Sequence, residues 1–185
     1  MKLKNRVSLL GMLFCVFLAI AGSARAQENS KVEIAGNYTY IHINPGGFST
    51  VTIDCHGGGG SAAWSLNHYL GVVGEFSRCE WSGANAHTFT YLFGPRLTYR
   101  AYGRLEPFGE VLLGGANIHG QTVGFSGSGT DSSFAMAIGG GADYKLKPSV
   151  AIRFIQADYL YTRLGGTNQN NFRLQVGVVF RFGGR

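Results

Sequence analysis

The sequence lacks helical membrane spans, metal-ligand motifs and phosphate-binding loops. Beyond residue 26, no apolar run reaches the roughly 18 residues of a membrane helix. The run Gly57–Gly60 is not followed by the Lys-Ser/Thr pair of a phosphate-binding loop, so we expect a flexible loop there. The histidines are scattered without metal-ligand spacing: His42, His56, His68, His87 and His119. We therefore expect no catalytic, cofactor-binding or metal site.

Charge is also scarce, and its basic balance comes from one end of the chain. The net charge of +6 includes four basic and no acidic side chains in residues 1–26, which leaves 12 basic against 10 acidic residues, or +2, in the remainder. Because no basic cluster remains there, we expect no nucleic-acid partner.

The N-terminal residues have the pattern of an export signal. Lys2, Lys4 and Arg6 precede an apolar run from Val7 to about Gly22, and Ala24-Arg25-Ala26 supplies an A-x-A cleavage site. We expect residues 1–26 to be a cleaved secretory signal peptide and residues 27–185 to form one mature domain.

Cysteine is rare, and two cysteines follow the predicted signal peptide, Cys55 and Cys79. An even pair in an exported protein favours a disulfide over free or metal-bound thiols. We therefore predict a Cys55–Cys79 bond.

The chain is rich in glycine, with 29 residues, in aromatic side chains, at 13%, and in period-two alternation. This combination suits strands and tight packing, and it gives about eight strands. In the last strand large apolar residues alternate with polar or small ones: Phe172, Leu174, Val176, Val178, Phe180 and Phe182 against Arg173, Gln175, Gly177, Val179 and Arg181. In the preceding strand, SVAIRFIQADYLYTRL, the alternation of apolar and polar residues shifts by one position partway along. A β-bulge near Ile155 would restore the register of this strand.

Two environments fit strands with one apolar face: the core of a soluble sheet, as in a lipocalin-like binder, or lipid around a barrel. The connection lengths favour lipid, because long polar connections alternate with short turns, as in an up-and-down outer-membrane barrel. We predict an all-β, eight-stranded antiparallel up-and-down transmembrane β-barrel. Its expected outer loops are Asn44–Gly60, Arg78–His87, Asn117–Ser132 and Arg163–Asn171, which place Cys55 and Cys79 in neighbouring loops.

Lipid outside the barrel would put ionisable side chains inside it. The polar faces carry Glu75, Arg96, Glu110, Arg153, Arg173 and Arg181. An eight-stranded barrel is filled by its side chains, and buried charges must pair, so we expect an Arg–Glu network that involves Arg96, Glu75 and Glu110. A proton or ion path is the alternative. Glycines on these faces would leave room for the arginines or mark bends: Gly94, Gly114, Gly139, Gly141 and Gly177.

The apolar faces carry aromatic residues towards the strand ends, as interfacial girdles require: Tyr38, Tyr40, Phe89, Tyr99, Phe180 and Phe182. Together with the stretches NHYLGVVGEF, YLFGPRLTYR, PFGEVLLGGA and FAMAIGGGADYKL, this pattern resembles the small outer-membrane β-barrel domain family, the OmpA/OmpX-like barrels. The resemblance covers about Val32 to Phe182 and implies residence in outer-membrane lipid as a monomer.

The closing stretch QVGVVFRF resembles the family's C-terminal signal for the barrel-assembly machinery, and Val176, Val178, Phe180 and Phe182 would carry it. Family members usually end on the aromatic residue itself, whereas Gly183-Gly184-Arg185 follow Phe182 here.

The resemblance implies a structural or surface-interaction role through the extracellular loops, and it leaves the extracellular partner open. A narrow pore for small solutes is one alternative. A lipid-modifying barrel enzyme is another, and it would need a nucleophile and a base near one rim. The one group of candidate nucleophile and base residues close together in the sequence lies in the third long loop: His119, Ser126, Ser128 and Asp131. The spacing of this set is generic for a polar loop, so we expect no enzyme.

Overall fold

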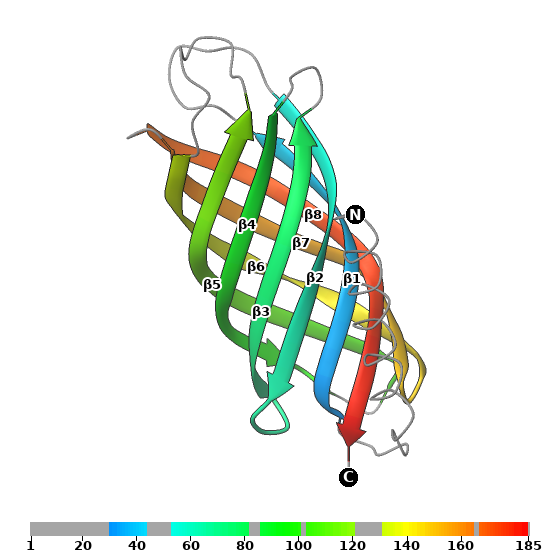
Figure 1. The fold of residues 1–185 in the computed structure, drawn as a ribbon. Coiled ribbons are helices and arrows are strands. Elements are labelled where there is room, and N and C mark those ends of the chain that lie inside the picture. The colour runs from blue at the N-terminus through cyan, green and yellow to red at the C-terminus, as the bar shows by residue number, and fades with distance from the viewer. Residues whose placement is uncertain are drawn as a thin grey trace, which may run out of the picture.

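The computed structural model describes residues 30–43, 53–81, 86–100, 103–120, 131–164 and 167–184. Its elements are eight strands: β1 (Ser30–Ile43), β2 (Ile53–Ser65), β3 (Leu70–Trp81), β4 (Ala86–Thr98), β5 (Leu105–Gly120), β6 (Asp131–Lys147), β7 (Val150–Leu164) and β8 (Thr167–Gly184). Each strand is antiparallel to its neighbours, and β8 pairs with β1 to close the barrel (Figure 1). The predicted fold is confirmed. Residues 1–26, the predicted signal peptide, lie outside the described residues.

The barrel has two ends that differ in their connections. The lower end, where Ser30 lies opposite Gly184, also carries the turn 66–69 and the turn 148–149 (Figure 1). The upper end is where β1 ends at Ile43 and β8 begins at Thr167. Within the described ranges, no helix is long and apolar enough to cross a membrane.

Alternation sorts the side chains of each strand into an outward apolar set and an inward set. In β8, Phe172 is 48% exposed and Arg173 is 0% exposed, and Val176 and Val178 point outward while Val179 is buried. The assignment of faces in β8 is therefore confirmed.

The bulge predicted near Ile155 is present in β7. The register shifts between Arg153 and Gln156 against β8, and it shifts on the opposite side of the strand against β6. Phe154 and Ile155 are both exposed, whereas Arg153 and Gln156 are both buried. Two consecutive residues thus face outward, which keeps the polar side chains on both sides of the bulge inside the barrel.

The strands are longer than the sequence indicated, so the predicted outer loops were too long. The run Gly57–Gly60 is not a loop but part of β2, where it pairs with both β1 and β3. The predicted outer loops shrink to the connections 44–52, 82–85, 121–130 and 165–166. Two of these four are short, so the predicted alternation of loop lengths holds only in part. Cross-strand hydrogen bonds made by long neighbouring strands recruit residues whose composition alone indicates a loop.

The Cys55–Cys79 disulfide is confirmed, with a Cα–Cα distance of 5.6 Å, but its predicted place in two outer loops is wrong. Cys55 lies in β2 and Cys79 in β3, and both side chains are buried inside the barrel. The bond therefore joins two strands that are already paired rather than two loops.

Candidate functional site

The lower third of the interior holds a cluster of ion pairs around Arg181. Its Nη2 lies 2.6 Å from Glu106 Oε2, and its Nε lies 3.3 Å from Glu33 Oε1. Two cations complete the cluster: Arg100 Nη2 contacts Glu33 at 3.1 Å, and Lys145 Nζ contacts Glu106 at 2.9 Å. Each of the two buried carboxylates therefore has two basic partners.

In the middle of the interior, two arginines lie near the same aromatic ring. The guanidinium carbons of Arg96 and Arg153 lie 4.5 and 4.6 Å from the ring centroid of Phe108. Arg96 pairs with Glu110 at 2.7 Å, and Arg153 pairs with Asp143 at 2.9 Å. Ion pairs and cation–π contacts together offset part of the desolvation cost of both arginines.

Above these pairs, Arg173 is fully buried between two carboxylates. It contacts Glu75, and its Nη2 donates to Asp158 Oδ2 at 2.7 Å. Gln156 links this group to the middle of the barrel, since its Nε2 donates to Glu110 and to Asp158, at 2.9 Å each. A hydrogen-bonded network therefore runs through the centre of the interior.

The structure places all six charges named from the sequence inside the barrel, but it pairs them differently. Arg96 contacts Glu110, whereas Glu75 contacts Arg173 instead of Arg96. Sequence reasoning missed the acidic residues Glu33, Glu106, Asp143 and Asp158. The alternation of apolar and polar residues could have identified Glu33 and Glu106, because each has an apolar outward neighbour in its strand.

A Cβ at any of the five interior glycines would first meet atoms other than those of an arginine. A Cβ on Gly139 would meet Ala157 O and Asp158 Oδ1, and no arginine is among the nearest atoms at any of the five. The glycines instead allow neighbouring strands to approach closely on the inner face.

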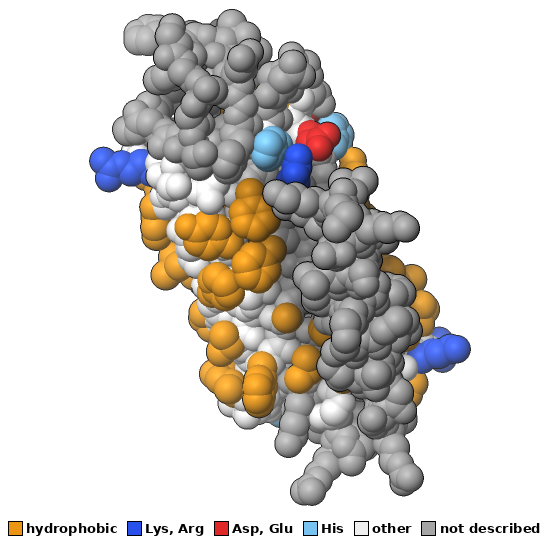
Figure 2. Space-filling model, viewed as in Figure 1, with side chains coloured by type: hydrophobic (Ala, Val, Ile, Leu, Met, Phe, Trp, Pro, Cys, Tyr) orange, Lys and Arg blue, Asp and Glu red, His pale blue; other side chains and the backbone are white. Residues whose placement is uncertain are grey.

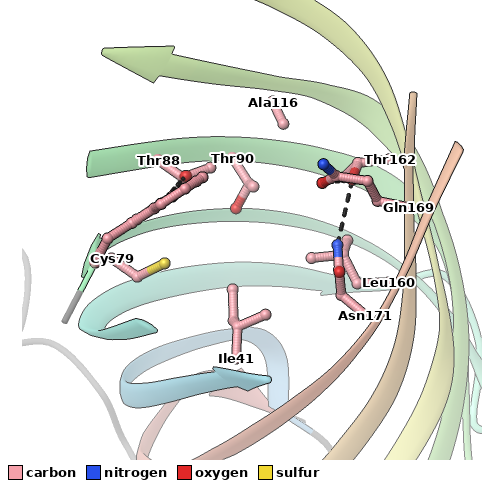
Figure 3. A pocket seen from close by; sticks show the side chains of 10 residues that line it. Ile41, Cys79, Thr88, Thr90, Ala116, Leu160, Thr162, Gln169 and Asn171 are labelled. Atoms are coloured by element: carbon pink, nitrogen blue, oxygen red, sulfur yellow. Dashed lines mark hydrogen bonds between the residues drawn. The ribbon is translucent and has the colours of Figure 1, made fainter. Parts of the chain in front are cut away.

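An apolar layer lies above the network. Buried Ile41, Leu92, Leu112 and Leu160 pack there with the disulfide. Over this layer lies a cavity of about 20 Å³, lined among others by Trp81, Thr88, Thr162 and Asn171 (Figure 3). Such a volume accommodates about one water molecule. This cavity is therefore too small for a solute.

The outer surface carries an apolar band between two sets of tyrosine and tryptophan side chains. Towards the lower end lie Trp64, Tyr69, Tyr99 and Tyr144, all exposed. Towards the upper end, four tyrosines bond to polar groups on the neighbouring strand: Tyr38 to His56, Tyr40 to Asp54, Tyr159 to Asn170 and Tyr161 to Asn168. The exposed side chains between these sets are apolar, among them Phe76, Phe93, Leu113, Ile138, Phe154 and Val176. Tyr38, Tyr40 and Tyr99 belong to the sets as predicted. Phe89 lies opposite Arg78 near the upper end, and Phe182 lies opposite Val32, which is also paired with Trp64, near the lower end. Phe180 lies two residues further into the barrel than Phe182.

Above the band on β1–β4, the outward side chains become polar and charged. This upper rim consists of His42, Asp54, His56, Arg78, Glu80 and His87. Figure 2 shows apolar side chains over the middle of the visible face, with basic, acidic and histidine side chains above them.

Two of the four residues considered for an enzyme lie in strands that the structure describes. His119 lies in β5 and Asp131 in β6, while Ser126 and Ser128 lie outside the described residues. Among the residues that the structure describes, no group of three or more His, Cys, Asp or Glu residues could hold a metal ion.

Several solved outer-membrane proteins are similar to this barrel. Neisserial surface protein A is 15% identical, with 83% of this chain and 98% of that chain covered and a TM-score of 0.66. Ail of Yersinia pestis is 19% identical, with 82% and 99% covered and a TM-score of 0.51. The N-terminal barrel of Pseudomonas aeruginosa OprF is 14% identical, with 84% and 100% covered and a TM-score of 0.50. At these identities the likeness shows the fold alone.

No curated protein matches the sequence. A family model does: residues 12–182 match the outer membrane protein beta-barrel domain. A chain whose closed barrel is apolar outside and ion-paired inside, and which matches this model over most of its length, belongs to the family of outer membrane protein beta-barrel domains.

Proposed function

We propose that the protein is a sealed barrel with a structural or surface-interaction role, and that it does not conduct solutes. The buried ion pairs across the interior support this proposal. Arg153 and Arg173 are 0% exposed, and each bonds to at least one buried acid. A solute that passed along the axis would have to break these pairs in a low-dielectric interior, which costs several kcal/mol for each charge left alone.

The orientation of the barrel belongs to the same proposal. In outer-membrane barrels, short turns face the periplasm and longer loops face outside. The lower end carries the connections 66–69, 99–104 and 148–149, and the upper end carries 44–52, 82–85, 121–130 and 165–166. The two longest connections, 44–52 and 121–130, are both at the upper end. We therefore assign the upper end to the cell exterior, where an extracellular partner would bind.

Export, assembly and oligomeric state complete the proposal. Residues 1–26 would act as the cleaved signal peptide, and the mature barrel would reside in lipid as a monomer. Val176, Val178, Phe180 and Phe182 would carry the signal read by the barrel-assembly machinery. The outward position of Val176, Val178 and Phe180 on the final strand supports this role, because an assembly factor can reach an outward face before the barrel closes.

Conductance measurements test the sealed interior. The barrel, with folding verified by heat-modifiable gel mobility, would be reconstituted into planar bilayers, with a porin as positive control. We expect no steady current steps. Uniform steps whose ion selectivity changes in Glu110→Gln would establish the narrow pore instead.

A loop replacement tests the surface role. Replacing residues 121–130 with a short glycine-rich turn should leave heat-modifiable folding intact and reduce adhesion of cells that display the protein. Unchanged adhesion in this variant and in an equivalent replacement of residues 44–52 would contradict a role for these connections.

A further inference from the structure

A groove lies on the outer surface near the lower end of the barrel, between β4 and β5. It has a volume of about 310 Å³ and is lined, among others, by Tyr69, Leu97, Tyr99, Pro107 and Gly109. Leu97 lies opposite Gly109, and the backbone N–H of Tyr99 donates to Pro107 O at 2.8 Å. Large outward side chains on β4 and in the turn 66–69 therefore stand beside small ones on β5, and this difference in size forms the groove.

The floor of the groove is formed by small residues and has room above it. A Cβ at Gly109 would meet Gly139 O at 3.7 Å, which is an ordinary contact, so a group could occupy this space without strain. On β6, Gly140 lies opposite Gly109 and Ala142 lies opposite Pro107, so the low surface continues onto the next strand. The groove is therefore built into the register of β4, β5 and β6.

The groove is continuous with the apolar band that faces the bilayer. Val111 is the next outward residue above Gly109 on β5, and it lies opposite the exposed Ile138. Tyr69 and Tyr99, at the other end of the groove, belong to the lower set of aromatic residues, whose amphipathic rings suit the headgroup level. An occupant must therefore be apolar along the groove and polar at its lower end. A lipid acyl chain fits, and the volume holds about ten methylene groups if each takes roughly the 30 Å³ of a water molecule.

The strand ends below the groove carry exposed positive charge. Arg104 directly precedes β5 and Lys147 ends β6, and both are exposed. The backbone N–H of Lys145 donates to Arg104 O at 2.7 Å, which joins these two strand ends. The acidic residues described at this end are buried inside the barrel and have basic partners there: Glu33, Glu106 and Asp143. The exposed charge of this end of β5 and β6 is therefore basic.

We propose that this groove binds one anionic glycerophospholipid of the periplasmic leaflet. One acyl chain lies along Leu97 and Gly109, and Arg104 and Lys147 bind the phosphate of the headgroup through charge-assisted hydrogen bonds. Three residues separate Arg104 from Pro107, roughly 10 Å along an extended chain, so the charges lie just beyond the groove. The choice of leaflet rests on the orientation proposed above, and the site is separate from the surface role at the upper end.

Native mass spectrometry of the mature barrel in detergent tests the site. The barrel is offered equal concentrations of phosphatidylglycerol and phosphatidylcholine with identical acyl chains. We expect it to retain one phosphatidylglycerol molecule with about a tenfold preference, because each basic residue at a headgroup adds a few-fold. Equal retention of the two lipids, or a dimer of barrels in place of the lipid adduct, would overturn the proposal. Stronger retention of lipid A than of phosphatidylglycerol would overturn the assignment to a glycerophospholipid.

Two variants separate the headgroup from the chain, with folding verified by heat-modifiable gel mobility. The double variant Arg104→Gln and Lys147→Gln should lose the preference for phosphatidylglycerol, whereas Arg78→Gln at the upper rim should keep it. Gly109→Leu fills the groove and should reduce retention of both lipids, whereas Gly36→Leu, on the outer face of β1, should not.

A preference that survives in the double variant, full retention in Gly109→Leu, or equal losses in the two controls would overturn the site. The orientation is checked separately by protease cleavage on intact cells. Cleavage within 148–149 instead of 121–130 would contradict the orientation and the choice of leaflet, and it would leave the measured lipid site in place.

Discussion

At the scale of single residues, the buried arginines are the positions where one substitution has the largest effect. Arg173 has no exposed surface, and it contacts two acids that are themselves buried. Removing its charge leaves Glu75 and Asp158 without their cation in a low-dielectric interior. An exposed pair such as Arg78 and Glu80, separated by 3.6 Å at the surface, is screened by solvent and contributes little.

We expect Arg173→Met to destabilise the barrel by about 3–5 kcal/mol, because it breaks a buried pair and leaves two carboxylates uncompensated. Arg78→Met is the matched control, with an expected change under about 1 kcal/mol. Urea unfolding in lipid vesicles, followed by tryptophan fluorescence and gel mobility, measures both. Adding Glu75→Gln and Asp158→Asn to Arg173→Met should restore part of the loss. Equal effects of the two single variants would refute the buried network.

The disulfide gives a second prediction at this scale. The double variant Cys55→Ala and Cys79→Ala should lower stability by up to about 3 kcal/mol, since the bond closes a loop with a sequence separation of 24. Mass mapping of the wild-type protein without reductant should recover the Cys55–Cys79 peptide pair, and two free thiols would rule the bond out.

At the scale of strands, the close approach of neighbours on the inner face depends on glycine. A Cβ at Gly139 would collide with the carbonyl oxygen of Ala157 on β7, whereas a Cβ at Gly36 on the outer face of β1 would meet nothing within 4 Å. Gly139 and Gly36 therefore have different roles although both lie in regular strands. The bulge in β7 has a comparable role, since it keeps polar side chains inside on both sides of it.

We expect Gly139→Ala to destabilise the barrel by about 1–3 kcal/mol through overpacking against β7. Gly36→Ala should change stability by less than about 0.5 kcal/mol, as an open surface site does. The fraction of protein with folded mobility after refolding across a urea series compares the two. If Gly36→Ala were the more harmful variant, the assignment of inner and outer faces would be wrong.

At the scale of the whole molecule, the apolar band determines whether the barrel is stable in water or in a lipid bilayer. Large apolar side chains are exposed around the outer face, and tyrosines lie on both sides of them. In water such a surface would drive aggregation. In a bilayer it is favourable, and the closed sheet leaves no unpaired edge in contact with hydrocarbon.

Arginine substitutions at two depths on β8 measure this environment. Val176, 46% exposed, lies midway between Phe172 and Phe180, and Asn170 lies among the upper tyrosines. Val176→Arg should cost about 2–4 kcal/mol in lipid and Asn170→Arg about 0–1 kcal/mol, because the penalty for a charge depends on its depth. Reversible unfolding in vesicles gives both values. A soluble barrel would tolerate both changes equally.

Local patterning was enough to predict the strand number, the sidedness of the strands and the bulge, because side-chain direction alternates with period two in any strand. The limits of the strands were predicted poorly. Gly57–Gly60 indicated a loop by composition, but long partners on both sides hold it in β2. Alternation identified six of the interior charges and could have identified Glu33 and Glu106 as well. The pairing of Glu75 with Arg173 could not be predicted in this way, because these residues are 98 positions apart in the chain.

The sequence by itself determined which side chains point inward and which point outward, since that choice is made residue by residue along each strand. Only the closed tertiary structure determined which inward charges form ion pairs and which outward side chains lie at the same height on the barrel. Closure of β8 onto β1 brings Arg173 towards Glu75, and the stagger of neighbouring strands collects His42, His56 and His87 on one rim. These neighbours depend on the register between strands, which is set by the whole sheet and not by any one of its segments.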